Sequence, residues 1–239
     1  MDSQVLICNK LCKSYKTGQP VLNEFSFCVE SGRVVGLLGP NGCGKSTLLK
    51  LVSGILVPDG GEIIICGKER SEESNSLLSF LPERPYFASN MKIGELLEFF
   101  SDFYGDFDVL KAKAMLADFS ISLDSRIRSL SKGNKEKVQL ILVMSRRARL
   151  YLLDEPIGGV DPAARDYVLD AIIKNRNEES SVLITTHLIS DVERILDDYA
   201  FMSYGGQIIA SGNAEEARCL EGRSLDEQFR EVFKCSKNA

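Results

Sequence analysis

Short apolar runs occur along the chain at intervals and predict strands. They lie at residues 4–8, 21–30, 33–38, 62–66, 150–153 and 181–185. The run at 33–38 is typical of a strand that is buried on both faces of a sheet. Helical patterns separate several of these runs, so we expect an α/β fold with a mainly parallel sheet.

A mostly helical insert is predicted between about residues 76 and 148. Its clearest helix carries an apolar stripe at helical spacing, formed by Ile93, Leu96, Leu97 and Phe100. Further helices are expected near residues 109–119 and 138–145, the second of them after a cap-like Ser131.

The remaining turns and helix ends complete one domain over residues 1–239. Asp161-Pro162 predicts a helix start, because Asp caps a helix and Pro is favoured at its first position. Tyr204-Gly-Gly-Gln207 predicts a hairpin, and Ser224 with Glu227 predicts a capped final helix.

Charge and composition change this picture by excluding classes of partner. The chain has 239 residues, 26% of them charged, and a net charge of −5. Proteins that bind nucleic acid usually carry the opposite sign, so we expect no nucleic-acid partner. The basic run Arg146-Arg-Ala-Arg149 is attributed to a helix C-terminus, where positive charge complements the helix dipole.

Cysteines and termini indicate a cytoplasmic protein. The seven cysteines are odd in number and form no C-x-x-C pair, which favours free thiols over disulfides or a zinc site. No signal-peptide pattern is visible, and the apolar runs are far shorter than the roughly 20 residues that span a bilayer. Any role at a membrane therefore requires a partner.

A phosphate-binding loop follows the predicted strand at 33–38. The sequence fits G-x-x-x-x-G-K-S/T and opens a helix, which is the context that supports the motif. In this interpretation Lys45 reaches the β- and γ-phosphates of a nucleotide, and Ser46 binds Mg²⁺. The residues expected to hold the nucleotide here are Gly39, Pro40, Asn41, Gly42, Cys43, Gly44, Lys45, Ser46 and Thr47.

A second acidic motif follows the strand at 150–153. Asp154 and Glu155 stand at the strand end, where the second half of a P-loop NTPase site is expected. Asp154 would hold Mg²⁺, and Glu155 would polarise the attacking water as a general base.

Together these motifs resemble the ATP-binding cassette (ABC) ATPases over nearly the whole chain. Leu130-Ser-Lys-Gly-Asn134 is similar to the family's Leu-Ser-Gly-Gly-Gln signature. The resemblance implies that Ser131 and Gly133 contact ATP held by an opposite subunit, and that Asp161 crosses the dimer interface. It also implies a γ-phosphate contact for His187, the single histidine, and adenine stacking for Tyr15.

The resemblance further implies a fold and partners. The fold is a P-loop NTPase (RecA-like) core with an N-terminal antiparallel β subdomain and a helical insert subdomain. The partners are a second ABC ATPase subunit, identical or related, and an integral membrane permease that docks near Glu83 and the insert. Tyr86 and Phe87 are the candidate contacts, and the protein is expected on the inner face of the cell membrane.

The chain departs from the family pattern at three positions. Lys132 and Asn134 replace Gly and Gln in the signature, and Lys132 adds positive charge near a phosphate site. Glu83 replaces the usual Gln that links Mg²⁺ and the attacking water to the permease groove. Two segments, Asp154–Pro162 and the tail near Ser224, resemble more narrowly those of bacterial drug- and antibiotic-exporter ATPases.

Other classes of protein are alternatives. A soluble ABC ATPase of iron–sulfur cluster assembly would also be a single cassette. A kinase or GTPase would share the phosphate loop, but the chain has no Asn-Lys-x-Asp segment to bind guanine. The ABC transporter ATPase that powers a membrane subunit, and most simply an exporter, is the favoured hypothesis.

Overall fold

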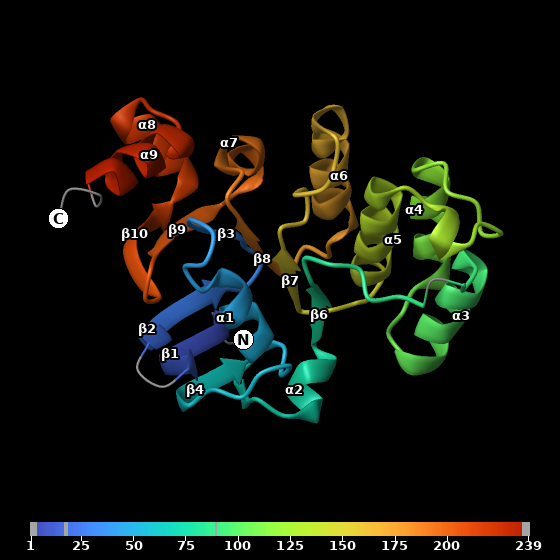
Figure 1. The fold of residues 1–239 in the computed structure, drawn as a ribbon, viewed down its shortest axis with the longest axis horizontal. Coiled ribbons are helices and arrows are strands. Elements are labelled where there is room, and N and C mark those ends of the chain that lie inside the picture. Colours follow the sequence, from blue (N-terminus) through green and yellow to red (C-terminus); the bar gives the residue numbers. More distant parts are fainter. Residues whose placement is uncertain (1–3, 17–18, 89, 236–239) are drawn as a thin grey trace.

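The computed structural model describes residues 4–16, 19–88 and 90–235, which form two sheets and the helices around them (Figure 1). The larger sheet has the strand order β10-β9-β3-β8-β7-β6. Its strands are β3 (Val34–Leu38), β6 (Leu78–Leu81), β7 (Leu150–Asp154), β8 (Ser181–Thr186), β9 (Asp198–Ser203) and β10 (Gln207–Asn213). All neighbouring pairs run parallel except β9 and β10, which form the predicted hairpin.

The smaller sheet is antiparallel and has the order β2-β1-β4-β5. It contains β1 (Gln4–Lys16), β2 (Gln19–Glu30), β4 (Gly60–Ile65) and β5 (Lys68–Glu69). The prediction placed only residues 4–8 in the first strand. That strand is longer because it continues through several irregularities in its pairing with β2, and local alternation of apolar residues does not reveal such pairing.

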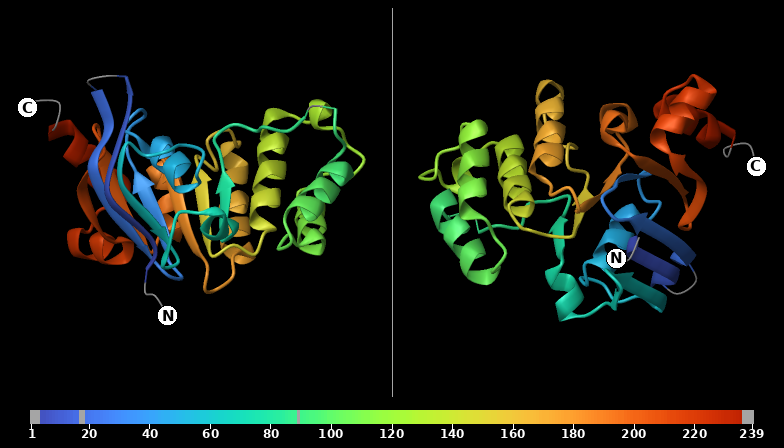
Figure 2. Two further views of the ribbon diagram at one scale, coloured as in Figure 1. Left: turned by 90° about the horizontal axis from the view of Figure 1, so that it is seen from below. Right: turned by 180° about the vertical axis from the view of Figure 1, so that it is seen from behind.

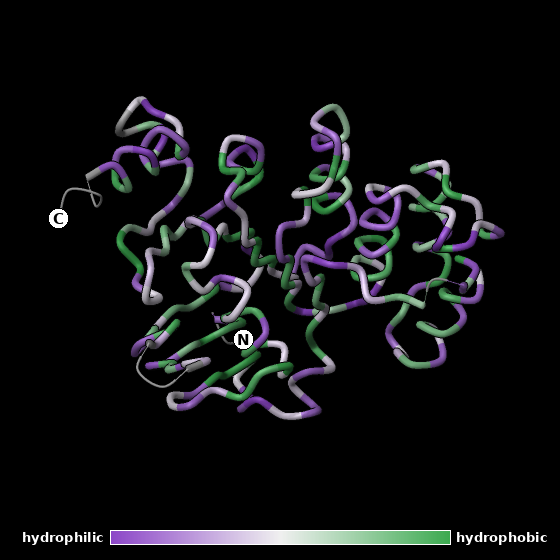
Figure 3. Tube along the Cα trace, viewed as in Figure 1, coloured by the Kyte–Doolittle hydropathy of each residue, from purple (hydrophilic) through white to green (hydrophobic). Residues whose placement is uncertain are grey.

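The central strands are buried on both faces, as the apolar run in β3 predicted. Along β7, Leu150 and Leu152 pack toward the antiparallel sheet and α1 (Lys45–Val52), whereas Tyr151 and Leu153 pack toward the other helices. Figure 3 shows the hydrophobic positions concentrated in these strands and on the inner sides of the helices. A parallel sheet covered in this way holds its strand ends rigidly, and the candidate site lies at those ends.

Helices make up the rest of the described chain. The helices of the predicted insert lie together at one end of the molecule in all three views (Figures 1 and 2). They are α3 (Ile93–Phe103), α4 (Val109–Asp118) and α5 (Lys132–Met144). The others are α2 (Glu72–Ser76), α6 (Pro162–Asn175), α7 (Ile189–Val192), α8 (Ala214–Glu221) and α9 (Leu225–Cys235).

Sequence patterns located the longer helices, whereas the short helices α2, α7 and α8 were not predicted. The stripe Ile93, Leu96, Leu97 and Phe100 is buried in the core, and Asp161 caps α6 by accepting a hydrogen bond from the Ala163 N–H at 3.0 Å. Strand β6 lies within the range 76–148, yet it pairs with β7 in the large sheet. None of the helices in the described ranges is long and apolar enough to span a membrane.

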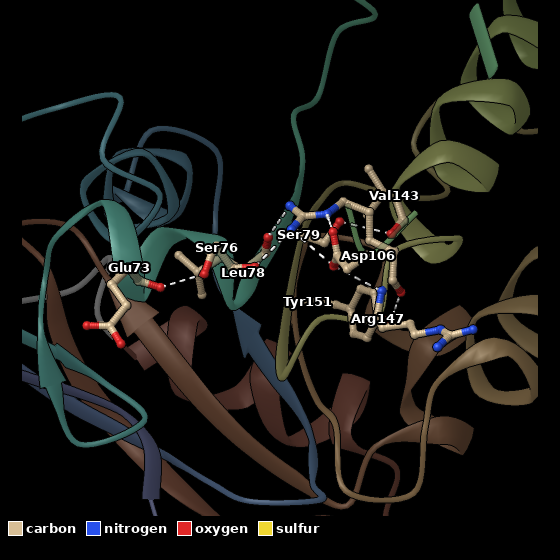
Figure 4. A network of polar contacts seen from close by, with 9 residues as sticks. Glu73, Ser76, Leu78, Ser79, Asp106, Val143, Arg147 and Tyr151 are labelled. Carbon is tan, nitrogen blue, oxygen red and sulfur yellow. Dashed lines mark hydrogen bonds and ion pairs between the residues drawn. The ribbon is translucent and has the colours of Figure 1, made fainter. Parts of the chain in front are cut away.

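Arg146 joins the insert to the edge of the large sheet. Its guanidinium is buried and donates to the carbonyl oxygens of Leu78 (2.6 Å) and Ser76 (2.8 Å), and it pairs with Asp106 at 3.0 Å. The Tyr151 hydroxyl donates to the Arg146 carbonyl oxygen at 2.6 Å. Figure 4 shows Ser76 at the end of α2, Leu78 and Tyr151 of the sheet and Asp106 of the loop after α3 converging at this junction. Arg146 therefore does more than complement a helix dipole.

Replacing Arg146 tests this junction. Arg146→Ala leaves buried carbonyl oxygens and the Asp106 carboxylate without their donor, so we expect a loss of about 3–5 kcal/mol in the free energy of unfolding. Urea unfolding followed by circular dichroism measures it. Arg147→Ala is the matched control, because Arg147 is exposed and its pair with Asp108 is worth below about 1 kcal/mol. Equal losses in the two variants would contradict the assignment.

Candidate nucleotide-binding site

The phosphate loop connects β3 to α1 and requires glycine at several positions. Gly42 and Gly44 have φ angles of 83° and 114°, in the left-handed region that glycine favours. A Cβ atom at Gly39 would collide with the Met202 carbonyl oxygen of β9. The loop is therefore shaped by both its own dihedral angles and the neighbouring strand.

Lys45 is buried at the start of α1, and its ammonium group lies over the loop. The Nζ atom donates to the carbonyl oxygens of Gly39 (2.7 Å) and Pro40 (3.1 Å). A buried ammonium with two neutral acceptors still lacks a counter-charge, which makes this position suited to an anion such as phosphate. Cys43 is part of the phosphate loop and its side chain is buried, and this burial raises the pKa of its thiol.

Asp154 ends β7 directly behind the phosphate loop. Its Oδ1 atom accepts hydrogen bonds from Ser46 Oγ at 3.0 Å and Thr185 Oγ1 at 2.7 Å. Burial raises the pKa of this carboxyl, although the two hydroxyl donors oppose the change. The Ser46 hydroxyl oxygen and the Asp154 carboxylate oxygens lie close together, and oxygen atoms of these kinds are the ligands that a hard divalent cation prefers.

Glu155 is the first residue after β7. Its side chain is held by two residues at the end of β8, Thr186 and His187. Its carboxylate accepts from Thr186 Oγ1 at 2.8 Å and lies 2.8 Å from His187 Nδ1. Its backbone has a φ of 49°, held by a hydrogen bond from its N–H to the Thr185 carbonyl oxygen. A carboxylate oriented in this way can accept a proton from a water molecule.

These groups open into one cleft of about 970 Å³. Tyr15 is exposed at its rim, and its hydroxyl lies 3.2 Å from Thr47 Oγ1. The predicted residues that line the cleft are Tyr15, Asn41, Gly42, Gly44, Lys45, Ser46, Thr47, Glu83, Glu155 and His187. Gly39, Pro40, Cys43 and Asp154 support it from below.

The other predicted residues line a second hollow of about 460 Å³. Ser131 and Gly133 lie there beside Asn134 at the start of α5, opposite Asp161. Ser131 caps α5, since its Oγ accepts from the Asn134 N–H at 3.2 Å. The cleft and the hollow meet at Gly158 and Gly159.

The sequence interpretation missed several polar residues at the site. Thr185 and Thr186 hold the two acidic residues, and Gln139 Nε2 donates to the Pro82 carbonyl oxygen at 2.9 Å, next to Glu83. The signal for the threonines was present, because they end a strand parallel to the one that bears Asp154. Among the described residues no group of three or more His, Cys, Asp or Glu side chains could hold a metal ion by itself.

The parallel sheet, the phosphate loop and the acidic strand end define a P-loop NTPase fold. The model of the ABC transporter family matches residues 22–158. Among relatives, EcsA of Bacillus subtilis is 30% identical over 91% of this chain and 92% of its own, and LptB of Haemophilus influenzae is 31% identical over 96% of each. This chain therefore belongs to the ABC transporter family, as an ATP-binding subunit and an ATPase.

Two further comparisons agree. YtrB of Bacillus subtilis is 32% identical over 77% of this chain, which spans only 64% of YtrB. A solved structure described as the ATP-binding subunit of an ABC transporter superimposes with a TM-score of 0.85 and 29% identity, over 96% of this chain and 99% of its own. The predicted fold class is thereby confirmed.

The buried Asp154 should destabilise the protein when no nucleotide is present. The pKa of Asp154 is higher in the folded protein than in the unfolded chain. Above the unfolded-state pKa, ionisation of Asp154 therefore lowers the free energy of unfolding. This loss disappears at lower pH, where Asp154 is protonated in both the folded and the unfolded state. Asp154→Asn keeps the hydrogen-bond acceptor and removes the charge. We expect higher stability than wild type at pH 7, with the gap closing toward pH 4, measured by urea unfolding without Mg²⁺.

Asp59 is the control of opposite sign. A hydrogen bond from Lys13 and a second from the Ser14 N–H lower the pKa of Asp59. Asp59→Asn should therefore reduce stability at pH 7, and this loss should fade as the pH falls. A stabilised Asp59→Asn protein, or a destabilised Asp154→Asn protein, would refute the electrostatic assignment.

Proposed function

We propose that two copies of this chain, or one copy and a related subunit, bind two ATP molecules between them in a head-to-tail dimer. Each site uses Lys45, Ser46, Asp154, Glu155 and His187 of one subunit with Ser131 and Gly133 of the other. Closure of the dimer drives a separate membrane-spanning permease between conformations, and ATP hydrolysis resets it. The cassette acts as one domain over residues 1–239.

One observation carries this proposal. Lys45 and Ser46 line the cleft, whereas Ser131 and Gly133 of the signature segment line the second hollow of the same chain. Ser131 is exposed, and its partners Gly133 and Asp161 face the second hollow instead of the ammonium of Lys45. The exposed helix start, with its free N–H groups, is suited to the phosphate of a nucleotide held by a second subunit.

The chemistry follows from the groups at the strand ends. Lys45 binds the β- and γ-phosphates, while Tyr15 stacks on adenine at the rim. Ser46, Asp154 and Glu83 would hold Mg²⁺, which would neutralise phosphate charge. Glu155 takes a proton from the attacking water. His187 orients the Glu155 carboxylate through its Nδ1 contact and presents its other ring nitrogen to the γ-phosphate.

A groove of about 1130 Å³ beside the cleft is the proposed permease site. It lies where the edge strand β6 meets the insert, and its exposed apolar side chains are Ile55, Tyr86 and Phe103. The segment from Pro82 to Tyr86 runs between groove and cleft, since Arg84 lines both. Tyr86 is exposed in this groove and stays a candidate contact, whereas Phe87 is half-buried against the core near Phe100.

We place the complex on the inner face of the cell membrane and propose export as the direction of transport. Support for export comes from one relative, LptB, which is the ATP-binding protein of a lipopolysaccharide export system. The narrower class of drug and antibiotic exporters stays a prediction.

Glu155 is the residue whose replacement tests the catalytic proposal most directly. Glu155→Gln removes the base and keeps the shape of the side chain, so ATP hydrolysis should fall by roughly 10²–10⁴-fold while ATP still binds. Steady-state phosphate release and fluorescent-nucleotide titration measure the two effects. Lys45→Ala provides the contrast, because it should abolish nucleotide binding as well. Near-normal turnover by Glu155→Gln would exclude Glu155 as the base.

Phe103 tests the docking groove. Phe103→Asp places a charge on an apolar contact that is 70% exposed, so the fold should survive while the membrane subunit no longer co-purifies from detergent-solubilised membranes. Leu110→Asp is the matched control, because Leu110 is 79% exposed on α4 and lies outside the groove. Recovery of the same multi-spanning protein with both variants would place the permease elsewhere.

A further inference from the structure

The first turns of α5 face two different surfaces. Ser131, Gly133 and Asn134 line the second hollow, whereas Lys132 and Glu136 line the cleft that contains Lys45 and Glu155 of the same chain. Residues four apart share one face of a helix, so Lys132 and Glu136 form a pair on the cleft side. The signature segment therefore points one of its faces at the nucleotide site of its own subunit.

Glu136 is an incompletely satisfied carboxylate. Its side chain is only 14% exposed, and the buried Oε2 atom has no hydrogen-bond partner in the part of the chain that the structure describes. The Lys132 ammonium lies 3.9 Å from Oε1, which is too long for a hydrogen bond. Burial raises the pKa of Glu136, and the field of Lys132 opposes that change. The pair is thus a loose electrostatic contact that leaves the ammonium largely hydrated.

Lys132 is free to leave this contact. Its side chain is 81% exposed, and no hydrogen bond from its ammonium is found within the described residues. The cleft it lines already offers phosphate the ammonium of Lys45 and the start of α1. Because charge-assisted contacts to phosphate are stronger than a solvated ion pair, a bound nucleotide would compete with Glu136 for Lys132.

Glu136 also contacts the loop that follows the catalytic residue. A Cβ atom at Gly159 would collide with both of its carboxylate oxygens, so the carboxylate lies directly against that backbone. The same loop is tied to Glu155 by a hydrogen bond of 3.0 Å from the Gly158 N–H to the Glu155 carbonyl oxygen. The resting partner of Lys132 is therefore packed on the segment that positions the base.

We propose that Lys132 is a phosphate-binding residue for the nucleotide of its own subunit, and that Glu136 restrains it when that site is empty. This inference rests on the proposed nucleotide site at Lys45. The signature segment then responds to both nucleotides of a dimer: Lys132 responds to the one in its own subunit, and Ser131 and Gly133 respond to the one in the partner subunit. The Lys132–Glu136 pair is intact when the nucleotide site of the same subunit is empty.

The two residues should change nucleotide affinity in opposite directions. In single subunits, confirmed by analytical ultracentrifugation at the protein concentration used, Lys132→Ala should weaken binding of a fluorescent ATP analogue about tenfold. Glu136→Gln removes the competing charge at constant shape and should tighten binding about two- to fivefold. Lys135→Ala is the control, because it makes the same charge change on α5 outside both surfaces.

A double-variant cycle separates direct from indirect effects. If Glu136 acts through Lys132, Glu136→Gln should not change affinity when Lys132 is already Ala. Unchanged affinity of Lys132→Ala single subunits, or an equal effect of Lys135→Ala, would overturn the proposal. Failure of the nucleotide site itself is a distinct result, in which Lys45→Ala binds the analogue as well as wild type.

Discussion

The Asp154 carboxylate holds the two halves of the site together. It ends β7, and it accepts hydrogen bonds from Ser46 at the start of α1 and from Thr185 at the end of β8. Parallel strands bring these chain segments to one edge of the sheet, and the shared buried acceptor fixes their distances. Its uncompensated charge is also what makes the position suited to a cation.

The buried sheet supplies the rigidity that this arrangement needs. Strand β7 packs apolar side chains on both faces, so Asp154 and Glu155 leave a strand end that cannot shift without disturbing two cores. The insert shares the apolar core on one face of this sheet. Polar contacts of Arg146 with the Leu78 carbonyl oxygen and of Gln139 with the Pro82 carbonyl oxygen add to its attachment. Polar junctions of this kind suit a part that must keep its position relative to the cleft while a partner binds beside it.

Helix α5 connects the surfaces on which the proposed function depends. Its start divides between the cleft of its own subunit and the hollow for a second one, and the two meet at Gly158 and Gly159. The absence of a side chain at Gly159 lets the Glu136 carboxylate lie against this loop, while the Gly158 N–H keeps the loop tied to the Glu155 carbonyl oxygen.

The sequence by itself determined the parts whose chemistry is local. Three features are each defined by a few neighbouring residues: the phosphate loop, the acidic pair Asp154-Glu155 and the apolar stripe of α3. All three lie at the expected places relative to the strands and helices. The N-terminal strand was underestimated because its length depends on pairing with β2. Thr186, Glu136 and Arg146 gained their partners only from the tertiary structure, since each contacts residues far away in the chain. Periodicity reports which face of an element is buried, whereas the fold alone decides what a polar group on that face meets.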